Sequence, residues 1–90
     1  MSSYKLAKNI AWQIQPTIEL VYILNITTNE FIYFDGVSKD IWLLLANNYH
    51  TDYIADKISN DYNVDKSMVY NDIHDFYNQL LEKGVIMQND

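Results

Sequence analysis

The spacing of the hydrophobic residues changes at about residue 35, and this change constrains the fold more than any other feature of the sequence. Before that point apolar residues alternate with period two, as in β-strands, and after it they recur with period 3.6, as in amphipathic helices. Ninety residues make one domain, since two separate cores would each be too small to persist. The sequence therefore predicts a single α+β domain over residues 1–90, with three antiparallel strands followed by three helices (βββααα).

Three segments of the first third alternate in polarity, and turn residues separate them. In "IELVYILNI" every second side chain from Ile18 to Ile26 is apolar and the opposite face is half apolar, as expected of a central strand. Pro16 has no N–H to donate and interrupts the ladder, and Asn29 can take the left-handed conformation that a tight turn needs. The pattern predicts a three-stranded meander with strands near 8–15, 18–26 and 30–34.

The rest of the chain predicts three helices, the middle ones arranged as a helix–turn–helix. Asp35 or Ser38 can cap a first helix that runs to about Asn48. Thr51 can cap a short second helix, which is followed by a loop at 60–64.

The third predicted helix is the longest. Asp65 caps its start, and Gly84, just after Lys83, suits its C-terminal end. Residues 85–87 then fold back as a short apolar tail. The apolar stripes of the three helices predict one shared core that includes Trp42, Ile54, Ile58, Val69, Ile73, Phe76 and Leu80.

The charge of the chain opposes a nucleic-acid partner. Residues 35–90 hold ten acids and four lysines, which accounts for the whole net charge of −6, and the chain has no arginine. Nucleic-acid-binding proteins neutralise phosphates with clustered lysine and arginine. The third helix would be the recognition helix of a DNA-binding helix–turn–helix, yet it carries acids along its surface. We therefore expect no nucleic acid among the partners.

No set of residues predicts catalysis, a metal site or a cofactor. The chain has no cysteine, His50 lies in a polar turn, and His74 has no second His or Glu at ligand spacing. The two glycines, Gly36 and Gly84, form no phosphate-binding loop. No run approaches the ~20 apolar residues of a membrane span, and no secretory signal is visible. These observations predict a cytoplasmic protein that is not an enzyme and contacts no membrane.

Three motifs follow one another in the helical half: "FDGVSKDIWLLL", "TDYIADKISNDYNVD" and "VYNDIHDFYNQLLEKGVI". In order and spacing they resemble the PqqD-like family, also called RiPP recognition elements, over about residues 18–87. The sequence departs from the family pattern at Phe34–Asp35, Ser38 and Asn29, where Leu–Asn, glycine and glycine are usual. The matching positions are Trp42, Thr51, Ile54, Ala55, Val69, Asp72, Ile73, Phe76, Leu80 and Gly84.

The resemblance implies a winged helix–turn–helix that binds a peptide without catalysing a reaction. Such elements hold the leader of a ribosomally synthesised precursor peptide (RiPP) as an extra strand beside their third strand and third helix. They deliver it to a modifying enzyme of natural product biosynthesis, such as a radical-SAM enzyme or a leader peptidase. The strand at 30–34 is also the expected edge of the meander, where a partner strand would satisfy exposed backbone groups. The residues expected to bind the leader are Phe31, Ile32, Tyr33, Phe34, Met68, Val69, Asp72, Ile73, Asp75 and Phe76.

The expected site is a cleft between the third strand and the third helix. Asp72 and Asp75 would form its polar rim, where a leader lysine, arginine or backbone N–H can bind. Tyr33 would lie on the other face of the strand, and ordinary packing against the first strand is the alternative for Phe31 and Tyr33. Two other functions stay open: a winged-helix DNA-binding transcriptional regulator and a purely structural accessory subunit. The expected cleft walls are Ile32, Phe34, Val69, Ile73 and Phe76.

Overall fold

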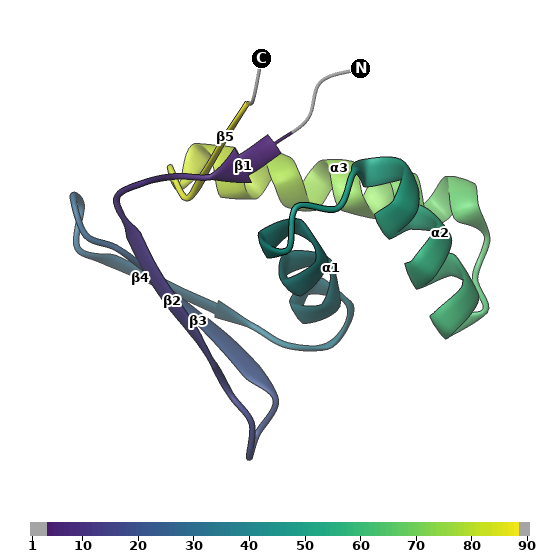
Figure 1. The fold of residues 1–90 in the computed structure, drawn as a ribbon, viewed down its shortest axis with the longest axis horizontal. Helices are drawn as coiled ribbons and strands as arrows, with labels where there is room; N and C mark the ends of the chain where they lie inside the picture. The colour runs from purple at the N-terminus through teal and green to yellow at the C-terminus, as the bar shows by residue number, and fades with distance from the viewer. Residues whose placement is uncertain (1–3, 89–90) are drawn as a thin grey trace.

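The computed structural model describes residues 4–88, which form two antiparallel sheets and three helices (Figure 1). The larger sheet has the strand order β2-β3-β4, with the helices on one side of it. This arrangement confirms the predicted α+β architecture of a three-stranded sheet followed by three helices. The elements are β2 (Ile10–Gln15), β3 (Leu20–Asn25), β4 (Glu30–Phe34), α1 (Gly36–Ala46), α2 (Thr51–Tyr62) and α3 (Lys66–Glu82).

A second, smaller sheet was not predicted. Strand β1 (Tyr4–Leu6) pairs antiparallel with β5 (Ile86–Gln88), and the two lie side by side near the ends of the chain (Figure 1). The N–H of Ala7 extends this pairing by donating to the carbonyl of Val85 at 3.0 Å. The expected tail at 85–87 does fold back, and it becomes a strand because the N-terminal segment supplies the partner.

The larger sheet buries the face of β3 that the sequence shows as half apolar. The helices cover Val21 and Ile23, whereas Ile18 and Ile26, at the ends of the fully apolar face, are exposed. The register explains this choice, because Ile23 lies between Trp12 and Ile32 of the neighbouring strands. Across three strands the covered face is therefore mostly apolar, with Asn25 as its buried polar residue, while the outer face includes glutamines from β2.

One core joins the covered face of the sheet to the helices. Trp42 of α1 connects the two parts of this core. The centroid of its ring lies 5.8 Å from the ring centroid of Trp12 and 6.0 Å from that of Phe34. All of the predicted core residues are buried, which confirms the helical stripes. They are Trp42, Ile54, Ile58, Val69, Ile73, Phe76 and Leu80.

The first two helix starts agree with the predicted caps only in part, because Asp35 lies at the predicted N-cap position and Thr51 does not. Asp35 is the N-cap of α1, but its side chain makes no capping hydrogen bond, and Ser38 lies inside the helix. Thr51 is the first residue of α2 rather than its cap, a position that His50 occupies. Helix α2 also extends into the predicted 60–64 loop.

The end of α2 and both ends of α3 are explained by the residues found there. Helix α2 ends at Asn63, whose left-handed φ of 53° stops the helix. The side chain of Asp65 accepts a hydrogen bond from the N–H of Ser67 at 3.2 Å, which confirms the predicted cap of α3. Gly84 adopts a φ of 70° after the last turn, as predicted for its C-terminal stop.

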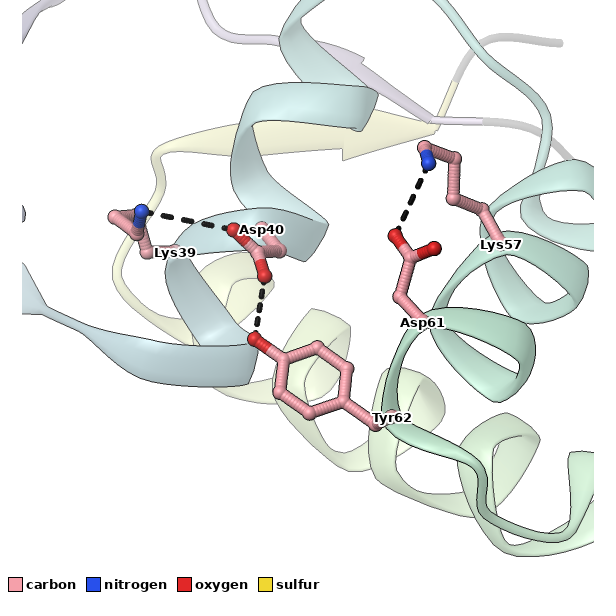
Figure 2. Close-up of polar contacts among 5 residues, drawn as sticks. All are labelled: Lys39, Asp40, Lys57, Asp61 and Tyr62. Atoms are coloured by element: carbon pink, nitrogen blue, oxygen red, sulfur yellow. Dashed lines mark hydrogen bonds and ion pairs between the residues drawn. The ribbon is translucent and has the colours of Figure 1, made fainter.

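A hydrogen bond between side chains ties α1 to α2 (Figure 2). The hydroxyl of Tyr62 donates to Oδ2 of Asp40 at 2.5 Å, and the ammonium of Lys39 lies 3.6 Å from the other oxygen of that carboxylate. The hydrogen bond to Asp40, aided by burial, raises the pKa of Tyr62 from its ordinary value of 10.0 to about 12. The folded chain therefore holds the phenolic proton more tightly than the unfolded chain does.

Replacing Ile73 tests the core assignment without touching the exposed surface. Ile73 is 1% exposed, so Ile73→Ala removes fully buried methylene and methyl groups. We expect the free energy of unfolding to fall by ~2–5 kcal/mol in a denaturant titration. The exposed Ile26→Ala serves as the control, with a loss of ~0.5 kcal/mol or less. A loss below ~1 kcal/mol for Ile73→Ala would contradict its place in the core.

The Tyr62–Asp40 bond predicts a loss of stability at alkaline pH. Because the folded pKa of Tyr62 is raised, its contribution is fully present below pH 10.0 and is lost as the pH rises through about 12. The side chain is exposed, so the contribution is small, ~0.5 kcal/mol. An absorbance titration of wild type minus Tyr62→Phe isolates this tyrosine, since Tyr77, whose pKa burial raises to about 12, remains in both proteins. If the difference in absorbance had its midpoint near pH 10.0, the ordinary pKa of tyrosine, the hydrogen bond between Tyr62 and Asp40 would be contradicted.

Candidate functional site

Strand β4 is an edge of the larger sheet, because β3 pairs with only one of its sides. In an antiparallel sheet alternate residues of an edge strand direct their N–H and C=O groups away from the neighbouring strand. The edge of β4 therefore offers a row of backbone donors and acceptors to which another strand can bind.

A cleft of about 240 Å³ lies between β4 and α3. The rings of Phe34 and Phe76 meet edge to face with centroids 5.1 Å apart, which joins the two elements. The ammonium of Lys83 lies 3.6 Å from the carboxylate of Glu30 and links the end of α3 to the beginning of β4. We call this hollow the β4–α3 cleft; its lining residues are Ile32, Tyr33, Phe34, Ser38, Phe76, Gln79, Leu80 and Lys83.

A second hollow, of about 250 Å³, lies between α1 and α3. It shares Ser38, Phe76 and Gln79 with the β4–α3 cleft, so the two hollows adjoin. Asp72 and Asp75 are exposed on its α3 side. We call it the acidic pocket; its remaining lining residues are Val37 and Ile41.

The structure brings together part of the predicted site. Ile32, Tyr33, Phe34 and Phe76 line the β4–α3 cleft, and the two aspartates lie in the adjoining pocket. Met68 is exposed on α3 but lines neither hollow.

Val69 and Ile73 were expected on the cleft wall, but the structure places them in the core, 2% and 1% exposed. Helix α2 covers this half of α3, as shown by the bond between the Tyr70 hydroxyl and Asp52 and by the Lys66–Asp56 ion pair. The apolar stripe of α3 therefore reaches the cleft only in its C-terminal half.

Phe31 and Tyr33 lie on the face of the sheet that carries no helix, 58% and 66% exposed. Their rings are 5.8 and 6.2 Å from that of Tyr22, which belongs to the central strand β3. Both rings therefore pack against the central strand, which lies between β2 and β4. Phe31 also lines a hollow together with Ala11 and Gln13 of the first predicted strand, so packing towards that strand stays an alternative role for Phe31.

Sequence reasoning missed several residues of the two hollows. Gln79 and Lys83 follow Phe76 at i+3 and i+7, so helical spacing from Phe76 indicates that they share its face. Val37 and Ile41 belong to the stripe of α1, and no signal in the sequence distinguishes a pocket wall from the core there.

The acids of the pocket have no counter-charge among the ion pairs of residues 4–88. Each lysine of the helical half is already paired with another acid: Lys39–Asp40, Lys57–Asp61, Lys66–Asp56 and Lys83–Glu30. The acidic pocket therefore presents uncompensated negative charge, which favours a cationic or N–H-donating ligand.

The described residues hold neither a cluster of metal ligands nor a helix that could span a membrane. Over residues 4–88 no group of three or more His, Cys, Asp or Glu side chains is placed to hold a metal ion. Within the same range no helix has the length and apolar character needed to cross a bilayer.

An open strand edge beside an apolar cleft defines a class of protein domain suited to strand addition by an extended peptide. Comparison with known families makes this class more specific: the family described as Coenzyme PQQ synthesis protein D (PqqD) matches residues 21–86. The chain belongs to the PqqD family, which confirms the resemblance found in its motifs.

A solved structure of TbiB1 in complex with the TbiA(beta) leader peptide is similar to this chain with a TM-score of 0.86. The two sequences are 27% identical, and the match covers 91% of this chain and 93% of that one. No curated protein sequence matches the chain significantly.

Proposed function

We propose that the protein binds the leader region of a ribosomally synthesised precursor peptide and delivers it to a modifying enzyme, without catalysing a reaction itself. The observation that carries the proposal is the open edge of β4 beside the β4–α3 cleft. It is supported by the similarity to TbiB1, whose structure contains a leader peptide, and by membership of the PqqD family.

In this mechanism the leader pairs with β4 as a fourth strand. Backbone hydrogen bonds along residues 30–34 supply affinity that depends little on sequence. Alternate leader side chains enter the β4–α3 cleft, where Ile32, Phe34 and Phe76 provide apolar contacts. The other side chains lie beside Phe31 and Tyr33 on the outer face.

The two hollows and their surroundings would select the leader. Asp72 and Asp75 accept hydrogen bonds from a leader lysine, arginine or backbone N–H. The exposed Met68 contacts a longer leader beyond the acidic pocket. Val69 and Ile73 do not contact the leader directly; they support the site because they hold α3 in place in the core.

The same proposal covers the fold type, the partner enzyme and the cellular location. The larger sheet forms the wing of a winged helix–turn–helix, and the partner enzyme is of a kind such as a radical-SAM enzyme or a leader peptidase. The protein acts in the cytoplasm, where precursor peptides are synthesised. DNA binding is disfavoured, because the exposed surface of α3 carries Asp72, Asp75 and Glu82.

The test of strand addition is an NMR titration of the ¹⁵N-labelled protein. The probe is a synthetic leader from the precursor peptide encoded beside the protein's own gene. We expect amide shift changes at residues 30–35 and 72–80, because these segments form the edge and the two hollows. Changes confined to the Tyr70, Tyr77 and Leu81 flank, with 30–35 unaffected, would place the site elsewhere.

Removing one rim carboxylate tests the role of charge. We expect Asp72→Ala to weaken binding of the same leader by ~1–3 kcal/mol if its carboxylate accepts a charge-assisted hydrogen bond. The fold stays intact because the side chain is exposed. Glu82→Ala is the matched control, since Glu82 is an exposed acid of α3 that lines neither hollow. Equal effects of the two substitutions would mean that only net charge matters.

A further inference from the structure

Asn25, the last residue of β3, is a buried polar residue (3% exposed) that lies where the β3–β4 hairpin meets the end of α3. Its side-chain oxygen accepts hydrogen bonds from the hairpin N–H groups of Thr27 at 3.1 Å and Thr28 at 3.2 Å. The same oxygen accepts from the side-chain amide of Asn9 at 3.0 Å. The Asn25 amide nitrogen donates to the carbonyl of Lys83 at 2.9 Å.

The chemistry of the partners fixes the orientation of this amide. Backbone N–H groups can only donate, so the atom that faces Thr27 and Thr28 must be the oxygen. The Lys83 carbonyl can only accept, so the other atom must be the nitrogen. Among the standard side chains of this length in their ordinary ionisation state at pH 7, an amide alone supplies an acceptor to the hairpin and a donor to the helix.

The contact between hairpin and helix is also close. Gly84 follows α3 with a φ of 70°, and a Cβ atom at this position would lie 3.2 Å from the Asn25 nitrogen. A side chain there would push against the amide. The glycine thus serves both the helix end and the approach of Asn25 to the Lys83 carbonyl.

We propose that Asn25 is a positioning residue that sets the width of the β4–α3 cleft. The hairpin leads directly into β4, one wall of the cleft, and Lys83 lies at the end of α3, the other wall. The Asn25–Lys83 hydrogen bond joins the two walls at this end, and Asn25 itself does not line the cleft, whereas Lys83 does. The inference rests on the proposed leader binding for its functional consequence.

The variant Asn25→Asp separates the contact of Asn25 with the hairpin from its contact with the Lys83 carbonyl. When ionised, the aspartate keeps the shape of the side chain and the acceptor for the hairpin N–H groups, but it replaces the donor to Lys83 with a second acceptor. The measurements are therefore made at about pH 8, well above the ordinary pKa of an aspartate, because a protonated carboxyl would still donate. Asn25→Ser is the second variant, used if the aspartate prevents folding; its shorter hydroxyl can still accept from the hairpin and does not reach α3. Thr27→Ala is the control, because it removes the 2.9 Å bond from Asn9 to Thr27 and leaves the Lys83 bond in place.

Two measurements are needed for each variant. The first is a spin-label distance distribution between Ile26→Cys and Glu82→Cys, two exposed positions on hairpin and helix in a chain with no other cysteine. The second is the affinity for the same synthetic leader. We expect Asn25→Asp to broaden the distance distribution and to weaken leader binding at least tenfold, while Thr27→Ala changes neither.

The outcomes distinguish this inference from the proposed function. An unchanged distance distribution in Asn25→Asp overturns the positioning role, and so does a broadened one with unaltered leader affinity. If the wild-type protein binds no leader, the proposed function fails, and the distance measurement alone decides whether Asn25 holds the hairpin to α3.

Discussion

The packing of Trp42 against the covered face of the sheet is the interaction on which the rest of the structure depends. Its ring contacts Trp12 of β2 and Phe34 of β4, and Phe34 in turn contacts Phe76 of α3. This chain of aromatic rings connects both outer strands to two helices. The Trp42 N–H has no protein acceptor within residues 4–88, so the ring is held by packing and not by a hydrogen bond to the protein. Truncating a buried tryptophan typically loses ~3–5 kcal/mol, so the packing of this ring is a large part of the stability of a small domain.

The same packing explains why β4 can remain an open edge. Its inward side chains, Ile32 and Phe34, are partly buried and pack against the core, which fixes the strand without a partner on its free side. A strand held only by edge-to-edge hydrogen bonds would need that partner for its own stability. Here stability comes from one face of the strand, so the free edge is available for binding.

The sequence predicted those parts of the structure that depend on local spacing. The stripe of α3, the Asp65 cap and the Gly84 stop each follow from residues within a few turns of one helix. The β1–β5 pair could not be predicted, because three-residue strands carry no period and their partners lie about 80 residues apart. The buried face of β3 depended on cross-strand neighbours, and the cleft walls depended on how much of α3 is covered by α2. Tertiary contacts, not local propensity, decide these features.

The negative charge of the chain opposes self-association through the open edge of β4. Unpaired strand edges associate with one another, and two copies of this chain could pair through β4. The acidic pocket adjoins the cleft beside β4, so both copies would carry the uncompensated Asp72 and Asp75 on the side of the molecule where they pair. Like charges repel there, and the net charge of −6 adds to the repulsion at longer range. Under the proposed function, a leader with cationic residues would be attracted at the same place, so the acids that oppose self-association would also favour that partner strand.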